Sequence, residues 1–230
     1  MELNKIFSFK RKIQLLFNYY QEYLFYKLTF YKKKKTIKRI NNIWKIVLTK
    51  KQISKLNKEH CILKIRLNED AIFAFKNDPS FFSLEETIIS SNGLYAIMVH
   101  RISNFLSQIG VVLIPRLLSE FAHSITGIDI HPDAKIGNRF FIDHGTGVVI
   151  GQTTYIGNDV KIYHGVTLGA KSIKNIDESK NKKRHPTILD GVVIYANATI
   201  LGGDTVIGKN SIIGTGKIVL ESISENSKVI

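Results

Sequence analysis

The sequence is poor in cysteine, because Cys61 is the only one among 230 residues. An intramolecular disulfide is therefore impossible, and a cysteine-rich metal site is excluded. Long apolar runs are also missing, since no stretch approaches the roughly 20 uncharged apolar residues that a membrane-spanning helix needs. The N-terminus lacks the apolar core and small-residue cleavage site of a signal peptide. These absences predict a soluble, cytoplasmic protein.

Acidic residues are scarce at the start of the chain. Residues 1–60 hold 16 Lys and Arg but 3 Asp and Glu, whereas residues 61–230 hold 17 and 16. The basic character therefore belongs to an N-terminal extension, residues 1–60, which also lacks glycine and proline and is expected to be helical. The lysine run at 32–35 favours a solvated helix face over contact with nucleic acid or an anionic membrane surface.

Residues 61–126 are predicted to form an α-helical domain. Apolar residues recur at three- and four-residue spacing between Leu94 and Leu106, and Gly110 ends this stripe. Ser83 followed by Glu86 has the form of a capping box, which indicates a helix start.

The final segment, residues 127–230, has a different periodicity. Aliphatic residues recur every six residues, as in Ile130, Ile136 and Ile142. This period fits neither a helix nor strand alternation. It is the pattern of a β-helix, in which three short strands complete a coil of roughly 18 residues. The repeat breaks over residues 170–186, which are predicted to form a loop extruded from the coils.

Four stretches resemble the serine O-acetyltransferase family, which begins cysteine synthesis from serine. They are "TGIDIHPDAKIGNRFFIDHGTGVVIG", "IGNDVKIYHGVTLGA", "KKRHPTI" and "VIGKNSIIG". The order "DIHP", "IDHGTG", "RHP" is the specific part, because hexapeptide repeats occur in many acyltransferases. The resemblance implies an α+β fold, with an N-terminal α-helical domain followed by a left-handed parallel β-helix. It also implies transfer of acetyl from acetyl-CoA to the hydroxyl of L-serine.

The resemblance assigns catalytic roles as well. Acetyl transfer from a thioester to an alcohol needs a general base, and histidine suits this role because its usual pKa lies near neutral pH. The family pattern gives the base as His144, its carboxylate partner as Asp129 and a second catalytic histidine as His185. The 15-residue separation of Asp129 and His144 predicts that the two stack on adjacent coils.

Serine carries an ammonium and a carboxylate, so its site needs anions and a cation. By resemblance, Asp78 and Asp143 bind the amine. Arg184 binds the carboxylate, which a guanidinium matches with two parallel hydrogen bonds. The alternatives are a helix N-cap for Asp78 and a turn residue for Asp143.

Acetyl-CoA is expected as the co-substrate, with no metal. The family pattern places its contacts on the backbone of four small residues: Gly169, Ala170, Ala196 and Ala198. Three basic loop residues either attract the CoA phosphates or form a solvated surface: Lys180, Lys182 and Lys183.

The resemblance also implies partners. Family members bring the site residues together at a subunit boundary, which predicts a homotrimer or a dimer of trimers. The C-terminal Ile230 resembles the isoleucine that enters the active site of cysteine synthase in many bacterial relatives, and a simple chain end is the alternative.

Three other functions compete with this one. A hexapeptide-repeat acyltransferase acting on a sugar or another alcohol would not need the Asp143 and Arg184 pair. A γ-type carbonic anhydrase shares the β-helix but binds zinc through three histidines. A non-catalytic assembly subunit would keep its binding surface without His144. The amino-acid clamp favours the serine O-acetyltransferase.

Overall fold

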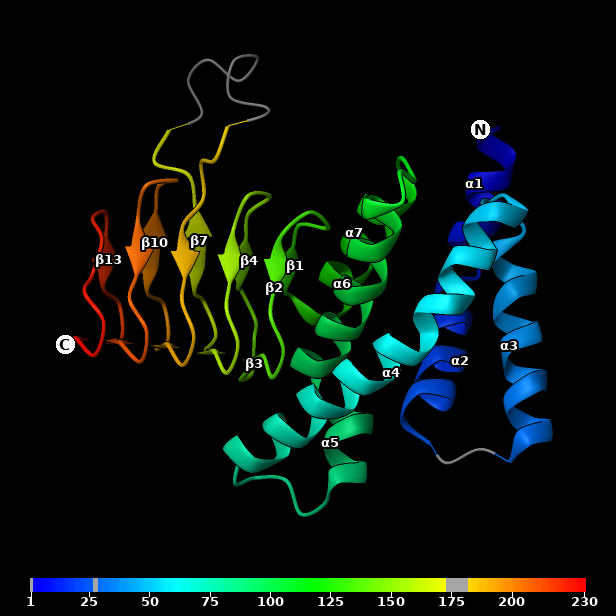
Figure 1. The fold of residues 1–230 in the computed structure, drawn as a ribbon, viewed down its shortest axis with the longest axis horizontal. Coiled ribbons are helices and arrows are strands. Elements are labelled where there is room, and N and C mark those ends of the chain that lie inside the picture. The colour runs from blue at the N-terminus through cyan, green and yellow to red at the C-terminus, as the bar shows by residue number, and fades with distance from the viewer. Residues whose placement is uncertain (1, 27–28, 173–181) are drawn as a thin grey trace.

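The computed structural model of the chain describes residues 2–26, 29–172 and 182–230. Over these residues, a helical domain precedes a stack of short parallel strands (Figure 1). The helices are α1 (Leu3–Lys10), α2 (Ile13–Phe25), α3 (Phe30–Trp44), α4 (Lys50–Asn77), α5 (Leu84–Ser90), α6 (Asn92–Gln108) and α7 (Ile114–Thr126). The strands are β1 (Asp129–Ile130), β2 (Lys135–Ile136), β3 (Phe141–Ile142), β4 (Val149–Ile150), β5 (Tyr155–Ile156), β6 (Lys161–Ile162), β7 (Thr167–Gly169), β8 (Thr187–Ile188), β9 (Val193–Ile194), β10 (Thr199–Leu201), β11 (Val206–Ile207), β12 (Ile212–Ile213), β13 (Ile218–Val219) and β14 (Lys228–Val229). Within the described ranges, none of the helices combines the length and apolar character that crossing a membrane requires.

Local sequence features set the helix ends. α4 begins with a capping box, in which Thr49 Oγ1 accepts from the Gln52 N–H and the Gln52 side chain accepts from the Thr49 N–H. Ser83 Oγ accepts from the Glu86 N–H at the start of α5, as the sequence predicts. Gly127 ends α7 in the left-handed conformation, with φ at 70°.

The basic N-terminal extension is helical, as expected, and it packs into the same core as the helices that follow. Trp44 of α3 and Tyr20 of α2 are fully buried, and the Trp44 indole donates to the Tyr20 hydroxyl at 2.9 Å. The expected boundary between residues 60 and 61 falls inside α4, which runs unbroken from Lys50 to Asn77. The two expected helical segments therefore share one helix and are not separated by a linker.

The six-residue repeat builds a three-sided prism. A first sheet contains β1, β4, β7, β10 and β13; a second contains β2, β5, β8 and β11; a third contains β3, β6, β9, β12 and β14. Neighbouring strands are parallel, and their inward aliphatic residues stack in register. Ile130 lies on Ile150, Leu168 lies on Ile200, and all four are at most 3% exposed. This confirms the β-helix that the repeat predicts.

The repeat is interrupted where the sequence predicts a loop over residues 170–186. Residues 173–181, including Lys180, lie outside the described part of the chain. The interruption does not shift the coil register, because Thr187 of β8 pairs with Tyr155 of the preceding coil.

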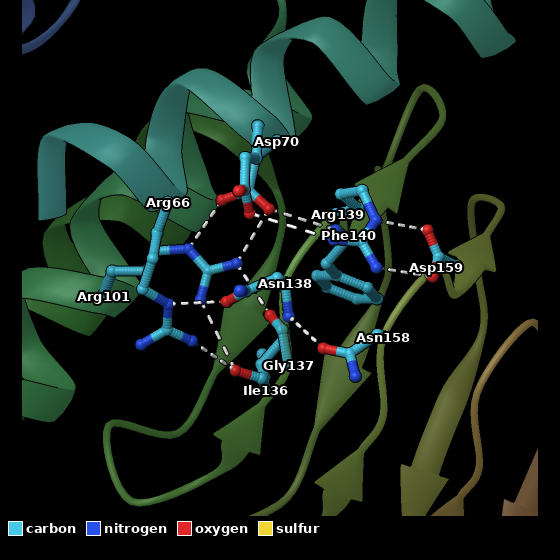
Figure 2. Close-up of polar contacts among 11 residues, drawn as sticks. Arg66, Asp70, Arg101, Ile136, Gly137, Asn138, Arg139, Phe140, Asn158 and Asp159 are labelled. Carbon is cyan, nitrogen blue, oxygen red and sulfur yellow. Dashed lines mark hydrogen bonds and ion pairs between the residues drawn. The ribbon is translucent and has the colours of Figure 1, made fainter. Parts of the chain in front are cut away.

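A buried ion pair fastens the helical domain to the first coil (Figure 2). Arg101 of α6 donates twice to Asp70 of α4, from Nε to Oδ2 at 2.6 Å and from Nη2 to Oδ1 at 2.8 Å. Both side chains are at most 2% exposed. Asp70 Oδ1 also accepts from the Phe140 N–H at 3.1 Å, and Arg101 Nη2 donates to the Gly137 carbonyl at 2.8 Å. The pair thus bonds backbone groups of a coil that has no preceding coil to pair with.

Two further contacts tighten this junction. Arg66 of α4 donates to Asn138 Oδ1 at 2.8 Å and to the Ile136 carbonyl at 2.9 Å (Figure 2). Gly93 of α6 approaches the first coil so closely that a Cβ there would lie 2.2 Å from the Ile142 carbonyl oxygen. The helices and the first coil therefore share a close-packed interface.

Candidate active site

Two corners of the prism carry the side chains that the sequence singles out. We call the turns from the third sheet to the first the His144 corner; it contains Asp143, His144, Tyr163, His164 and Tyr195. We call the turns from the first sheet to the second the His185 corner; it contains residues 131–133, 151–153 and 184–185.

His144 stands in an exposed turn directly after β3. Its φ of 55° is left-handed, and Gly145 follows with φ at 91°, so the chain turns sharply before β4. The imidazole is 73% exposed, and its Nδ1 lies 3.8 Å from Asp143 Oδ1. An accessible imidazole beside a carboxylate is suited to take a proton from an alcohol and to be stabilised as an imidazolium.

Aromatic rings extend this corner onto the next coils. The His164 ring lies 5.7 Å from the His144 ring, measured between centroids. Tyr163 stacks on Tyr195 at 5.1 Å with an interplanar angle of 20°. The imidazole of His144 is thus backed by a ring on the coil above, which restricts its orientations.

Asp78 reaches the same corner from the helical domain. It is the C-cap residue of α4, and so it is not the helix N-cap considered as an alternative. Its Oδ1 accepts from the N–H and the hydroxyl of Ser80 at 2.9 and 2.6 Å. Burial raises the pKa of Tyr163, and the charges of Asp143 and Asp78 add to this effect. The two carboxylates expected to bind an amine therefore lie near one tyrosine.

Thr153 holds the second histidine at the other corner. The Thr153 N–H donates to His185 Nδ1 at 3.1 Å, and Thr153 Oγ1 lies 2.8 Å from the same nitrogen. Oγ1 also accepts from the backbone N–H groups of Arg184 and His185, at 2.9 and 3.0 Å. Gly151 provides the space for the ring, because a Cβ there would lie 2.0 Å from His185 Cδ2.

These contacts define the protonation state of His185. A backbone N–H points at Nδ1, so Nδ1 is an acceptor and the proton of the neutral ring lies on Nε2. Burial, together with the nearby charges of Arg184 and Lys183, lowers the pKa of His185 to about 4. His185 is therefore neutral at pH 7, with its ring proton on Nε2.

A chain of side-chain hydrogen bonds reaches Arg184 from the helical domain. Arg184 Nη2 donates to Gln152 Oε1, and Gln152 Nε2 donates to Asp133 Oδ2 at 3.0 Å. The hydroxyl of Ser107, on α6, donates to Asp133 Oδ1. The guanidinium is thus oriented by a fixed partner, as binding of a carboxylate requires.

Asp129 is the first residue of β1, on the face of the first sheet between the two corners. The expected stacking of Asp129 on His144 is wrong within one chain, because Asp129 pairs with Val149. That register step is 20 residues, longer than a regular coil, so a separation of 15 residues leaves His144 in the turn before β4. Burial lowers the pKa of His131. The charge of Asp129 raises this pKa, and the charge of Arg184 lowers it.

The two corners are therefore separate within one chain. Along the chain, the turns of the His144 corner lead into strands of the first sheet, and the turns of the His185 corner lead out of them. The structure brings Asp78, Asp143 and His144 together at one end of this sheet. It brings Arg184 and His185 together at the other, and Asp129 lies on β1 between the two corners.

Known proteins show the family. No family model matches the sequence. The chain is 46% identical over 164 residues to the serine acetyltransferase of Bacillus licheniformis, a match that covers 71% of this chain and 73% of that protein. The chain belongs to the serine acetyltransferase family.

A second relative is the plasmid serine acetyltransferase of Synechococcus elongatus, which is 51% identical over 144 residues. The match covers 61% of this chain but less than half, 45%, of that protein. Serine acetyltransferases are acyltransferases that make O-acetylserine for cysteine biosynthesis. The relatives thus confirm the family and the reaction that the sequence motifs predict.

Solved serine acetyltransferases share the architecture. Isoform 3 from Entamoeba histolytica, in complex with cysteine, matches with a TM-score of 0.81 and 32% identity over 96% of this chain and 91% of that chain. The Neisseria gonorrhoeae enzyme in complex with serine matches with a TM-score of 0.72 and 27% identity over 94% and 79%. A serine acetyltransferase in complex with CoA matches with a TM-score of 0.68 and 30% identity over 77% and 71%. The predicted helical domain followed by a left-handed β-helix is confirmed.

The residues expected to contact acetyl-CoA divide between the two corners of this serine acetyltransferase family member. Gly169 and Ala170 leave the first sheet at the His185 corner, whereas Ala196 and Ala198 lie at the His144 corner. Ala198 is fully buried, and its backbone N–H and carbonyl both bond to neighbouring backbone groups. Contact of these four residues with CoA stays a prediction.

Lys183 is anchored at the His185 corner. Its Nζ donates to the carbonyls of Thr153, His185 and Pro186 at 2.8, 2.6 and 3.1 Å. An ammonium has three donors, so these carbonyls use all of them. Burial also lowers the pKa of Lys183. Lys183 therefore secures the returning chain, a role that neither of the two sequence alternatives included.

A groove of about 480 Å³ opens along the second sheet beside this corner, and Gln152, Thr153 and Lys183 contribute to its lining. Its volume suits part of a small-molecule ligand. In the part of the chain that the structure describes, no three His, Cys, Asp or Glu side chains cluster as a metal site.

Sequence reasoning missed Thr153 and Gly151. Both follow Ile150 in the repeat, one coil before "RHP", so the six-residue pattern placed them at a corner. Their partner His185 lies 32 residues beyond Thr153. The interrupted repeat between them hides the register, and therefore the contact, from the sequence.

Proposed function

We propose that this chain acetylates L-serine with acetyl-CoA at a site made by the His144 corner of one subunit and the His185 corner of the next. The observation that carries the proposal is the separation of the two corners at opposite ends of the first sheet. A cyclic trimer of prisms places unlike corners of neighbouring copies side by side. The relatives solved with serine and with CoA support this substrate pair.

His144 is the proposed general base. It accepts the proton of the serine hydroxyl while the oxygen attacks the thioester carbonyl carbon. The new C–O bond forms, the C–S bond breaks, and the departing CoA sulfur takes the proton from the imidazolium. Asp143, whose Oδ1 lies 3.8 Å from Nδ1, stabilises the imidazolium. Asp129, on β1 of the neighbouring subunit, is the proposed carboxylate partner of this histidine.

His185 is the proposed electrophilic partner. Its Nε2–H is available because Nδ1 accepts from Thr153. A neutral donor suits the negative charge that develops on the carbonyl oxygen during attack. Arg184 binds the carboxylate of serine, and the carboxylates of Asp78 and Asp143 bind its ammonium.

Mixed trimers test the shared site. His144→Ala and Arg184→Ala are each expected to abolish most turnover as homotrimers. When the two variants are unfolded together in equal amounts and refolded, every mixed trimer contains one site with both corners intact. Random mixing then restores about a quarter of the wild-type turnover. The measurement is CoA release with L-serine, and the two variants refolded separately and then combined are the control.

Two outcomes decide against the proposal. Mixed refolding that gives no more activity than the separate variants places the site within one chain. Sedimentation that shows only monomers with full activity excludes a shared site of any kind.

Docking of Ile230 into cysteine synthase is a separate proposal. The Ile230 side chain is 84% exposed, while Val229 is still bonded to the coil through the Gly214 N–H at 2.7 Å. An exposed aliphatic side chain beside a carboxylate resembles an amino-acid ligand. A peptide ending in "ENSKVI" is expected to bind cysteine synthase, and a peptide lacking Ile230 is expected to fail.

A further inference from the structure

We infer that Thr153 is the positioning residue of the His185 corner, fixing the tautomer of His185 and the position of Arg184. The inference rests on the proposed function, because it concerns residues that the proposal places against serine and the thioester. Thr153 touches neither substrate in this scheme. It acts through the two residues that do.

The Thr153 hydroxyl makes all of its hydrogen bonds to Arg184 and His185. Oγ1 accepts from the N–H groups of Arg184 and His185 at 2.9 and 3.0 Å. Its proton points to His185 Nδ1 at 2.8 Å, because that nitrogen is an acceptor. One donor and two acceptors are all that a hydroxyl offers, so Thr153 makes every side-chain hydrogen bond it can, all of them to two consecutive residues.

Neither of these two residues belongs to a strand in the described part of the chain. β8 begins at Thr187, so Arg184 and His185 precede the parallel ladder that orders the rest of the coil. Their backbone N–H groups bond to Thr153 Oγ1 in place of a strand partner. Lys183 reinforces the same attachment through its bond to the Thr153 carbonyl at 2.8 Å.

The ring of His185 depends on the same residue. The Thr153 N–H and hydroxyl both point at Nδ1, which leaves the ring proton on Nε2. Gly151 packs against the opposite part of the ring, at Cδ2. Without the hydroxyl, Nδ1 keeps one weaker donor, and the backbone N–H groups of Arg184 and His185 lose their acceptor.

The primary test compares three variants. Thr153→Val removes the hydroxyl and keeps the shape, Thr153→Ser keeps the hydroxyl, and Thr154→Val is the matched control. Thr154 is 1% exposed and its hydroxyl has no hydrogen-bond partner among the described residues, so removal of that hydroxyl is expected to leave the kinetics unchanged. Thr153→Val is expected to lower kcat/KM for serine about ten- to a hundredfold, with a smaller effect on the KM for acetyl-CoA. Thr153→Ser should recover most of this loss.

A second measurement is independent of turnover. Nitrogen-15 NMR of histidine-labelled wild-type protein at pH 7 is expected to show His185 neutral with its proton on Nε2. In Thr153→Val, the His185 signal is expected to shift toward a mixture of tautomers. The fold of each variant is checked by its urea midpoint. If Thr153→Val does not fold, the wild-type spectrum alone decides, since a proton on Nδ1 would overturn the inference.

The outcomes separate this inference from the proposed function. Loss of activity in Arg184→Ala and His185→Ala, together with normal kinetics in Thr153→Val, overturns the positioning role alone. Normal activity in Arg184→Ala and His185→Ala overturns the proposed function itself. Equal losses in Thr153→Val and Thr153→Ser show that the hydroxyl is not responsible, and they also overturn the inference.

Discussion

Single residues show how one protein gives two histidines different surroundings. The His144 imidazole is 73% exposed and lies beside a carboxylate, whereas His185 is 8% exposed and lies beside two cations. The exposed position leaves the His144 ring open to a substrate, whereas burial beside two cations keeps the His185 ring neutral. The division of roles in the proposed reaction therefore follows from the surroundings of each ring.

Replacement of His144 by alanine is expected to lower kcat by at least about a hundredfold, because the hydroxyl of serine then has no positioned base. The side chain is exposed, so the urea midpoint should not change. His123→Ala is the matched control, since His123 is a half-exposed histidine on α7, outside both corners. A His144→Ala variant with near-normal turnover would remove this residue from the base role.

At the scale of elements, the N-terminal helices form a core with its own polar chain. The Trp44 indole donates to the Tyr20 oxygen at 2.9 Å, and the Tyr20 hydroxyl is hydrogen-bonded to His60 Nε2 at 3.2 Å. Burial lowers the pKa of His60 to about 4. Burial also raises the pKa of Tyr20. The three rings are thus neutral and mutually bonded between α2, α3 and α4.

Because these three bonded rings include a buried histidine, we expect the protein to lose stability in acid. The pKa of His60 is lower in the folded state than its usual 6.5, so the unfolded state binds the proton more tightly. The stabilisation is fully present above pH 6.5 and is lost as the pH falls toward 4, by up to about 2–3 kcal/mol. His60→Gln keeps an acceptor for Tyr20 but does not titrate.

Urea unfolding at pH 7, 6, 5 and 4 measures this effect. As the pH is lowered from 7 to 4, the free energy of unfolding of the wild-type protein is expected to fall more steeply than that of His60→Gln. His100 and His185 contribute equally to both proteins, so the difference isolates His60. Parallel curves for the two proteins would show that His60 does not titrate on unfolding.

The sequence predicts elements where a period is sustained and fails where it is broken. The spacing of Ile130, Ile136 and Ile142 predicts the coils, because each aliphatic residue must face the prism interior. Asp129 was misplaced relative to His144, because the turn after β3 adds residues that the aliphatic spacing does not reveal. The boundary at residue 60 was drawn from charge, which describes the surface of a helix and not its extent.

The candidate site was predicted by motif and only partly by physics. Asp143, His144, Arg184 and His185 occur in short specific strings, and the structure places them at turns. Their supporting residues, Thr153 above all, are ordinary members of a repeat. Such contacts depend on which coil lies beneath which, and residue type carries no information about that.

For the whole molecule, the junction between helices and prism is the critical interface. Arg101→Met leaves the Asp70 carboxylate buried without its cation. We expect a loss of about 3–5 kcal/mol in the free energy of unfolding. Asp70→Leu combined with Arg101→Met should lose less than the sum of the single changes, because no unpaired charge remains.

Urea denaturation of the four proteins in this cycle provides the measurement. Additive losses would mean that the pair is not coupled, contrary to the two hydrogen bonds between the side chains. The serine KM of the Arg101→Met variant is a useful second observation. α4 ends beside Asp78 and the first coil leads to His144, so a loosened junction should weaken serine binding.

The same junction limits how these molecules can aggregate. A stack of parallel strands is open-ended by nature, and any exposed edge is a template on which another stack can grow. At the helical end, side chains of the helices already bond the Phe140 amide and the Ile136 and Gly137 carbonyls of the first coil, which an added coil would otherwise pair with. Whatever meets the opposite end, strand addition between such molecules stops at a pair, and a fibre cannot propagate. The helical domain therefore prevents these molecules from polymerising by strand addition.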